Sequence, residues 1–238
     1  ALRREGLELA GPHRAEVIPL GIATLVEPPP APPRELTICT VGSLVRRKRA
    51  DLVVRAFARI AAERPEARLV IVGEGPEREA LVRLVGALGV ADRVEMTGLL
   101  DARGAQERIA RASVMALPSV RESLGAVYLE AMALGVPALG TQGEGIAEHV
   151  EHGVTGILVP PDDEDALVAE LRALADDPER ARRIGEAGRR RFEAGPFSWS
   201  SNARAFLRLF EELLEARRAA ARGLSARGPA APPGPASP

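Results

Sequence analysis

Short apolar runs alternate with longer segments of helical periodicity from residue 35 onward. The apolar runs predict strands at 35–42, 67–73, 93–98, 113–119, 137–141 and 156–160. The 3.6-residue spacing of apolar positions predicts helices at 50–63, 76–88, 102–112, 125–134, 145–152, 163–176, 178–194 and 199–221. Short strands that alternate with helices indicate a parallel sheet covered on both faces. We therefore predict an α/β fold, a three-layer Rossmann-like parallel sheet whose ligands bind beyond the carboxyl ends of the strands.

The same pattern suggests the domain organisation. Residues 1–14 are typical of the end of a helix or of a linker, and 15–21 (AEVIPLG) predict a further short strand at the start of a main domain that spans 15–198. We expect 199–222 to form a C-terminal helix. The tail, 223–238, is rich in proline and alanine and lacks apolar periodicity, so we expect it to be disordered.

Composition excludes several classes of protein. The 238 residues are 46% hydrophobic, enough for a sizeable core, and the formal net charge is −1, which argues against a nucleic-acid-binding surface or a polybasic membrane anchor. No apolar run reaches the ~18 residues of a membrane-spanning helix. The single cysteine, Cys39, cannot form a disulfide within the chain, so we expect a reducing, cytoplasmic location.

The segment 121–141 combines a polar turn, an apolar helix and a short strand. The start of such a helix presents free backbone N–H groups and the positive end of the helix dipole, so it can bind a phosphate. Glu122 lies just outside this end, and Glu130 lies about 8 Å further along the axis. A phosphate site between two carboxylates suits a nucleotide-sugar. The structural alternatives are a glutamate favoured by the dipole (Glu122) and an ordinary helix-surface glutamate (Glu130).

Lys48 is the one lysine among 32 basic residues, the others being arginines. It lies in the run Arg46-Arg47-Lys48-Arg49, in the loop after the first strand of the predicted sheet. A compact ammonium in that loop suits a phosphate. The alternatives are chance, for the lysine, and a solvated or RNA-contacting basic surface, for the run.

The residues from Glu122 to Pro137 closely resemble the donor-binding motif of family 4 retaining glycosyltransferases, which have the GT-B fold. That motif has two glutamates separated by seven residues and commonly runs E-S-F-G-L-V-x-L-E-A-M-A-x-G-x-P. The resemblance extends from about Val17 to about Leu209 and includes segments 17–24, 72–81, 86–98, 143–167 and 197–203. It implies that the chain is the C-terminal, donor-binding domain of such an enzyme.

The loop at 42–49 resembles the family's G-R-L-x-x-x-K-G loop, in which the arginine and lysine bind the donor diphosphate. Gly42 would let the backbone approach the ligand, and Lys48 matches the phosphate-binding lysine. Ser43 stands where the family has arginine, and Arg49 where it has glycine. Arg47, or Arg46, could supply the arginine that Ser43 replaces.

The resemblance also assigns roles to residues of the apolar helix. Glu130 would accept hydrogen bonds from the ribose hydroxyls, and Glu122, the catalytic candidate, would lie by the transferred sugar and its reacting carbon. Sugar and diphosphate would contact Ser123 and the N–H groups of Gly125, Ala126 and Val127. Leu100, with Gly98 and Leu99, resembles the segment that lines the nucleobase, although a plain strand exit explains these residues nearly as well.

Two further motifs favour structural roles. Gly73-Glu74-Gly75-Pro76 lacks the third glycine of a dinucleotide fingerprint, so we interpret it as a turn before a helix. The acidic run 162–165 directly precedes an apolar helix, where acids cap N–H groups more often than they bind metals. The histidines His13, His149 and His152 have no His or Cys neighbour at metal-ligand spacing.

The resemblance implies transfer of a hexose or N-acetylhexosamine from a nucleotide donor, with UDP expected, and with retention of configuration. It implies no metal cofactor, and the net charge of −1 predicts no nucleic-acid partner. The other partner would be an N-terminal acceptor domain of the same enzyme, through which any peripheral membrane association would run. The last helix would then have a partly exposed apolar face. The alternatives are a non-catalytic nucleotide-binding or interaction domain and a nucleotide-sugar epimerase on the same fold.

Overall fold

The computed structural model describes residues 16–29, 33 and 35–226. By internal contacts the chain divides into two units, Ile22–Phe197 and the residues on either side of it, and each is described separately. The larger unit contains a six-stranded parallel sheet in the order β3-β2-β1-β4-β5-β6. The strands are β1 (Thr37–Val41), β2 (Arg68–Val72), β3 (Val94–Gly98), β4 (Val114–Ala116), β5 (Ala138–Thr141) and β6 (Ile157–Val159).

A short 3₁₀ helix connects β5 with β6, whereas the α-helices of this unit lie one in each connection from β1 to β5, as is usual in parallel sheets, and two after β6. They are α2 (Ala50–Glu63), α3 (Arg78–Ala87), α4 (Ala102–Ala110), α5 (Ala126–Ala133), α6 (Glu164–Asp176) and α7 (Pro178–Ala194). Three short 3₁₀ helices are η1 (Arg46–Lys48), η2 (Ala91–Arg93) and η3 (Gly145–Glu148). Each strand predicted between 35 and 160 is present, so the predicted α/β fold is confirmed.

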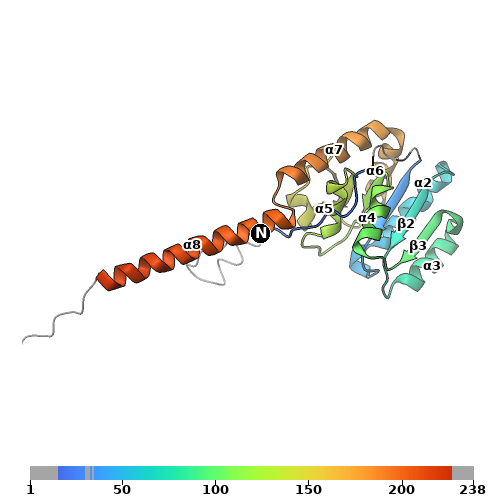
Figure 1. Ribbon diagram of the computed structural model, residues 1–238. Coiled ribbons are helices and arrows are strands. Elements are labelled where there is room, and N and C mark those ends of the chain that lie inside the picture. The colour runs from blue at the N-terminus through green and yellow to red at the C-terminus, as the bar shows by residue number, and fades with distance from the viewer. Residues whose placement is uncertain (1–15, 30–32, 34, 227–238) are drawn as a thin grey trace, which may run out of the picture. The chain divides into compact units, whose positions relative to one another are not determined.

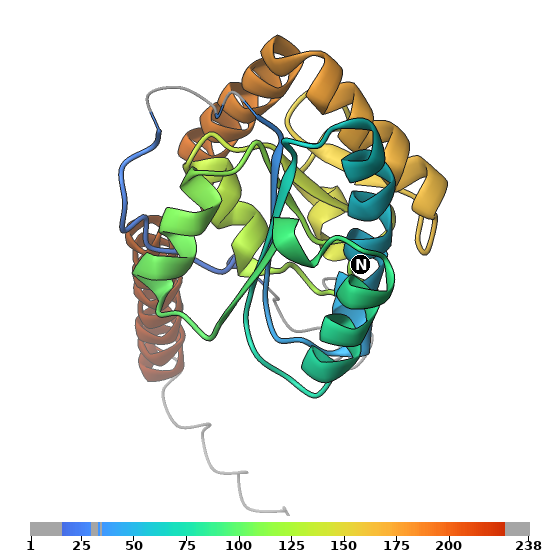
Figure 2. The same ribbon diagram turned by 90° about the vertical axis from the view of Figure 1, so that its right-hand side faces the viewer.

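The two faces of the sheet carry separate apolar cores. Ile38 and Cys39 are adjacent in β1, and both are fully buried, but they belong to different clusters because side chains alternate along a strand. Phe57 of α2 lies in one core with residues of α3 and α6, and Tyr128 of α5 lies in the other with residues of α4. Figures 1 and 2 show the sheet between these two layers of helices.

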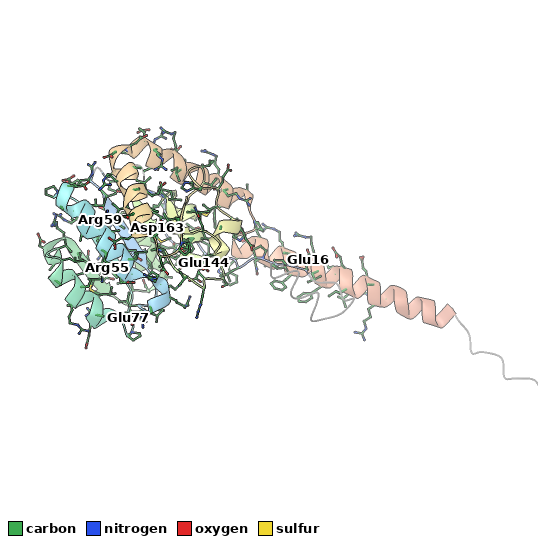
Figure 3. All side chains as sticks on the ribbon, turned by 180° about the vertical axis from the view of Figure 1, so that it is seen from behind. Glu16, Arg55, Arg59, Glu77, Glu144 and Asp163 are labelled. Carbon is green, nitrogen blue, oxygen red and sulfur yellow. The ribbon has the colours of Figure 1, made fainter. Side chains whose placement is uncertain are left out.

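Exposed ion pairs connect α2 with α6. Arg59 lies 2.7 Å from Asp165, beside the start of α6 in Figure 3. Arg172 contacts both oxygens of Glu63, at 2.9 and 2.6 Å. These pairs are exposed to solvent, so each contributes little, and the apolar contacts of the same helices dominate their packing.

The strand predicted at 15–21 is wrong, since residues 16–21 have no strand structure. Pro19 has no N–H to donate to a neighbouring strand, and its carbonyl accepts a hydrogen bond from the Asn202 side chain at 2.6 Å. The main unit begins one residue after this segment, where the Ile22 N–H donates to the Phe197 carbonyl at 2.8 Å.

The helix predicted at 145–152 is also wrong, because only η3 forms there. The His152 backbone forms a parallel bridge with Gly156, and its Nδ1 accepts a hydrogen bond from the Leu158 N–H at 3.1 Å. Because of these interactions, the residues after Glu148 do not continue the helix and instead form the connection that leads into β6. The strand predicted at 113–119 is shorter in the structure, where β4 spans Val114–Ala116. Pro118 has no N–H group to donate to a neighbouring strand.

The smaller unit contains α8 (Trp199–Ala226), which extends past the predicted end at 222. The disorder predicted for 223–238 therefore does not apply to 223–226, and 227–238 lie outside the described residues. The predicted exposure of its apolar face is confirmed, with 43–59% of each of these residues exposed: Trp199, Phe206, Leu207, Phe210, Leu213 and Leu214. Among the described residues, no helix is long and apolar enough to cross a membrane.

Phe57 of α2 is fully buried in one of the two apolar cores, and this position makes a prediction for its contribution to stability. Phe57→Ala should lower the free energy of unfolding by about 3–5 kcal/mol, because it removes buried contacts and leaves a cavity. Phe206→Ala, at an exposed position of α8, is the matched control and should cost far less. Urea denaturation measures both, and equal costs would contradict the assignment of Phe57 to the core.

Candidate functional site

The predicted site residues lie at the carboxyl ends of neighbouring strands. The sheet order reverses at β1, whose loop contains Gly42 to Arg49, and the next strand, β4, is followed by Glu122 and α5. Connections from β1 and β4 leave in opposite directions there, which opens a crevice beyond the strand ends. The loop after β5 contains Glu144, which contacts the backbone of Arg121 and Glu122.

Glu122 is the centre of a cluster of charges. Its Oε2 forms an ion pair with Lys48 Nζ and lies 3.3 Å from Arg47 Nη1. Only 9% of the Glu122 side chain and 14% of the Lys48 side chain are exposed, whereas Arg47 is 48% exposed. The structure thus brings three predicted site residues together. The two neighbouring arginines differ in their contacts, because Arg47 contacts Glu122 and Arg46 does not.

Glu144 fixes the backbone on which Glu122 sits. Its two carboxylate oxygens accept hydrogen bonds from the N–H groups of Arg121, at 2.9 Å, and Glu122, at 2.6 Å. The Glu122 carbonyl in turn accepts from the Gly145 N–H at 2.9 Å. A Cβ on Gly145 would lie 1.5 Å from the Ser123 oxygen, so this close approach requires glycine.

Sequence reasoning did not single out Glu144. The only local signal is a carboxylate between Gly143 and Gly145, directly after an apolar strand. Its function depends on contacts with residues more than twenty positions earlier, and periodicity does not reveal such contacts.

The amino end of α5 faces this cluster without a side-chain cap. Gly125 precedes the helix with φ +71°, and no side chain accepts a hydrogen bond at this end. The first N–H groups of α5, on Ala126 and Val127, therefore remain suited to an anion. Tyr128 anchors the helix below them, because its buried hydroxyl lies 2.9 Å from Ser119 Oγ and donates to the Leu117 carbonyl.

Glu130 lies half-buried on α5. Burial raises the pKa of its carboxyl, against the opposing effect of a hydrogen bond from Gln106. Gln106 is only 1% exposed, accepts a hydrogen bond from the Leu25 N–H at 2.7 Å and donates to the Ala23 carbonyl at 2.8 Å. Glu130 is thus held beside a segment that precedes β1.

The remaining donor-loop residues are positioned as follows. Gly42 donates its N–H to the Val72 carbonyl at 3.0 Å, and Ser43 is exposed beside it. Arg49, which stands where the family has glycine, has φ +53°, a conformation that glycine adopts more readily. Its guanidinium forms ion pairs with Asp51 and Asp162.

At the end of β3, Leu100 is half-buried against the α4–α5 core, and Leu99 is 80% exposed. Asp101 caps α4 through the Gly104 N–H at 2.7 Å. The structure therefore assigns Asp101 a structural role, and the nucleobase role of Leu100 stays a prediction.

The two motifs interpreted as structural have local roles. Gly73 and Gly75 both have positive φ, and α3 begins three residues after Gly75, as expected for a turn before a helix. Asp163 caps α6 by accepting a hydrogen bond from the Ala166 N–H at 2.9 Å, which confirms the capping interpretation. Within the described residues, no three His, Cys, Asp or Glu side chains lie close enough together to hold a metal ion.

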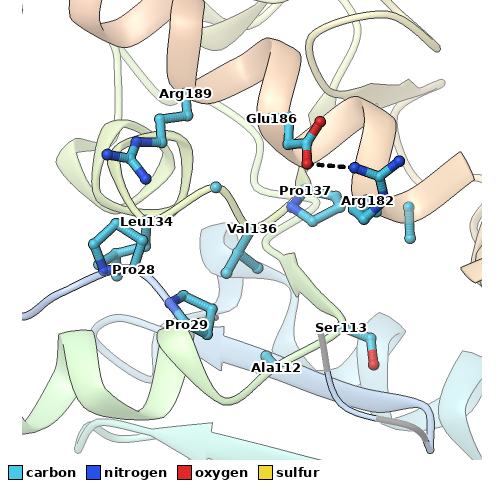
Figure 4. A pocket seen from close by; sticks show the side chains of 12 residues that line it. Pro28, Pro29, Ala112, Ser113, Leu134, Val136, Pro137, Arg182, Glu186 and Arg189 are labelled. Carbon is cyan, nitrogen blue, oxygen red and sulfur yellow. Dashed lines mark hydrogen bonds and ion pairs between the residues drawn. The ribbon is translucent and has the colours of Figure 1, made fainter. Parts of the chain in front are cut away.

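Figure 4 shows a pocket at the opposite edge of the sheet. It is lined by Ser113 and Pro137, at the amino ends of β4 and β5, together with Pro28, Pro29 and residues of α7. It contains none of the predicted site residues. Because ligands of parallel α/β sheets bind beyond the carboxyl ends of the strands, we place the site around Glu122 instead.

Comparison with known proteins identifies a family. A match to the family described as glycosyl transferases group 1 covers residues 22–191. The GDP-mannose-dependent alpha-(1-6)-phosphatidylinositol monomannoside mannosyltransferase of Mycolicibacterium smegmatis is 35% identical over 193 residues, which are 78% of this chain and 50% of that protein. The chain spans about half the length, or less, of the curated relatives that it matches.

Solved structures share the fold. Sucrose-phosphate synthase from Thermosynechococcus elongatus superposes with a TM-score of 0.78 at 30% identity, covering 91% of this chain and 57% of that one. The C-terminal domain of the group 1 glycosyl transferase LpcC from Francisella tularensis superposes with a TM-score of 0.67 at 20% identity, covering 74% of this chain and 99% of that one. The second likeness concerns the fold alone.

The contacts of Glu144 predict its contribution to stability. Glu144→Ala should lower the free energy of unfolding by about 1–3 kcal/mol, because two backbone N–H groups lose a charged acceptor. Glu144→Gln keeps one side-chain oxygen and should cost less. Glu148→Ala, at an exposed position of η3, is the control. Urea denaturation of the three variants tests this, and a Glu144→Ala cost equal to that of Glu148→Ala would contradict the proposed support of the Glu122 backbone.

Proposed function

We propose that this chain, which belongs to the group 1 glycosyl transferases, is the donor-binding half of a retaining glycosyltransferase. Its donor is a nucleoside-diphosphate sugar, with uridine as the base that the sequence resemblance implies. The Mycolicibacterium relative, in contrast, depends on GDP-mannose. Titration with nucleotides of several bases therefore identifies the base of the donor.

One observation supports this proposal most directly. Lys48, Arg47 and the uncapped amino end of α5 converge on Glu122 at the point where the sheet order reverses. A diphosphate placed there would meet a buried ammonium, a guanidinium and free backbone N–H groups. These groups stabilise the negative charge that develops as the diphosphate leaves, so the proposed reaction needs no metal.

Donor binding would exchange the partners of Lys48 and Glu122, which form an ion pair without the donor. When the diphosphate binds, the Lys48 ammonium turns from Glu122 to a phosphate oxygen. Glu122 is then available to hydrogen-bond the hydroxyls of the transferred sugar, close to the reacting carbon. Glu130 accepts hydrogen bonds from the ribose hydroxyls on the other side of the phosphates.

Binding of the acceptor requires a second domain. Transfer requires donor and acceptor atoms to approach within about 3–3.5 Å, and the elements described here account for the donor alone. We therefore propose that an N-terminal domain of the same enzyme binds the acceptor and that the exposed apolar face of α8 packs against it. The chain by itself should bind the donor without transferring sugar.

Calorimetric titration of the chain with UDP, GDP and ADP tests the proposal. One of these ligands should bind, and Lys48→Ala should weaken it much more than it weakens the corresponding nucleoside, because the ammonium acts on phosphate. Lys48→Arg should restore the affinity only partly, since a guanidinium needs more room. If none of the three binds, the alternative of an interaction domain without nucleotide binding replaces this proposal.

Glu130 makes a second prediction for nucleotide binding. Glu130→Ala should cost about 2–4 kcal/mol of affinity, because charge-assisted hydrogen bonds to the ribose are lost. Glu107→Ala, at an exposed position of the neighbouring α4, is the control and should leave affinity unchanged. Calorimetry measures both variants, and unchanged affinity in Glu130→Ala would remove the ribose assignment.

The raised pKa of Glu130 adds a pH dependence to the same experiment. The carboxylate accepts hydrogen bonds only when ionised, and burial makes it take up a proton at a higher pH than an ordinary glutamate. Nucleoside affinity should therefore fall on acidification in the wild type, with the pH dependence absent from Glu130→Ala. A nucleoside is used because it carries no phosphate that titrates.

A further inference from the structure

A second cavity lies beside η1, whose residues Arg46 and Arg47 both line it. It measures about 560 Å³ and is lined by Arg46, Arg47, Arg49, Asp51, Glu77, Val120 and Arg121. Arg47 is the only lining residue that it shares with the predicted donor site, since Gly42, Ser43, Lys48, Glu122 and Gly125 do not line it. The proposed function leaves this cavity without a role.

Backbone hydrogen bonds fix the walls of this arginine cavity. The Val120 N–H donates to the Arg47 carbonyl at 2.8 Å, which joins the loops after β4 and β1. The Glu77 N–H donates to the Leu44 carbonyl at 3.0 Å, which joins the loops after β2 and β1. Four arginines from two of these loops therefore surround one cavity in a defined arrangement.

Two of the four arginines already have acidic partners. Arg47 pairs with Glu122, and Arg49 pairs with Asp51 and Asp162. Within the described part of the chain, the side chains of Arg46 and Arg121 form no ion pair or hydrogen bond, and both are exposed. Among the residues that line the cavity, two arginines, Arg46 and Arg121, and one acid, Glu77, have no ion-pair partner among the described residues. The positive charges without a partner therefore outnumber the negative ones.

The conformation of Arg121 is unusual for its position. Its φ is +57°, a left-handed conformation that few residues other than glycine adopt. The Glu144 carboxylate, which accepts from its N–H at 2.9 Å, stabilises this conformation. Uncommon backbone conformations that the surroundings hold in place occur often at ligand sites.

We infer that the arginine cavity binds a phosphate monoester through Arg46 and Arg121, at a site separate from the donor diphosphate. Two guanidinium groups can each form paired hydrogen bonds with phosphate oxygens, and their charge matches that of a dianion. None of the seven lining residues is aromatic, so the cavity offers no aromatic ring on which a nucleobase could stack. A single phosphate group fits these features better than a polynucleotide.

The position of the cavity gives the ligand a role that rests on the proposed function. Arg47 lies between the cavity and Glu122, which we place beside the transferred sugar. A phosphate bound here would therefore lie near the reacting end of the donor, as the phosphate of a phosphorylated acceptor would. That phosphate could belong to a soluble molecule or to a lipid headgroup, because both present the same group.

Binding of inorganic phosphate tests the site, measured by ³¹P NMR line broadening above the second pKa of phosphate and at constant ionic strength. The variants are Arg46→Gln and Arg121→Asn, the latter because asparagine tolerates a left-handed backbone. We expect the double variant to lose about tenfold or more in phosphate affinity, as two charge-assisted contacts disappear. Arg190→Gln, an exposed arginine of α7, is the control and should bind as the wild type does.

A second titration separates this cavity from the donor site. With the chain saturated by whichever of UDP, GDP or ADP it binds, phosphate affinity should change by less than about threefold if the sites are independent. Complete competition would place the phosphate in the diphosphate site and overturn the inference. Equal losses in the double variant and in Arg190→Gln would overturn it as well.

Vesicles distinguish the two sources of the phosphate. Phosphatidylcholine vesicles with phosphatidic acid present a phosphate monoester, and those without it do not. Sedimentation of the chain with the first kind only, abolished in the double variant, would indicate a lipid headgroup. Binding of free phosphate without vesicle binding would indicate a soluble ligand, and the absence of both would reject the site.

Two controls keep the outcomes separate. Thermal unfolding confirms that the variants fold, and if Arg121→Asn does not, Arg46→Gln alone carries the test because its side chain has no contacts to lose. Nucleotide titration of the same variants isolates the proposed function. Phosphate binding without nucleotide binding would refute the donor assignment and leave the arginine cavity, whereas the reverse result would refute only the cavity.

Discussion

The arrangement of the site depends on how Glu122 is held from two sides. Lys48 and Arg47 attract its carboxylate, while Glu144 and Gly145 bind the backbone of the same turn. The ion pair with Lys48 is largely buried, so its desolvation offsets much of its attraction, and the backbone contacts give the turn its defined position. The charges then determine what the turn can bind.

Two close approaches shape this turn. Gly145 lies so near the Ser123 carbonyl that any side chain would collide with it, and a Cβ on Gly125 would come within 2.6 Å of the Tyr128 ring. Tyr128 is fully buried beneath the turn, and burial raises the pKa of its hydroxyl, so it remains a neutral donor to the Leu117 carbonyl. Core packing of α5 thus extends directly into the site, and loosening it would displace Glu122.

Periodicity predicted the fold well because a parallel sheet covered on both faces imposes strong local patterns. Apolar strands such as 67–73 and amphipathic helices such as 50–63 appear almost as predicted. The predictions that proved wrong concern segments whose conformation depends on residues distant in the sequence. Residues 15–21 have no strand with which to pair, and residues 149–152 form contacts with the segment before β6 in place of helical hydrogen bonds. Glu144 and the arginine cavity escaped prediction likewise, since each depends on residues brought together only by folding.

The geometry around Lys48 gives a physical reason for a lysine in a chain whose other basic residues are arginines. Its side chain lies beside Gly42, where a Cβ would lie 3.8 Å from Cε and 4.0 Å from Cδ of Lys48, and only 14% of the Lys48 side chain is exposed. A planar guanidinium would need more room and would direct several donors into this space. A compact ammonium reaches one carboxylate oxygen of Glu122 and can turn to an anion within the same space. The arginines surround the site where there is room, and the lysine occupies the position where there is not.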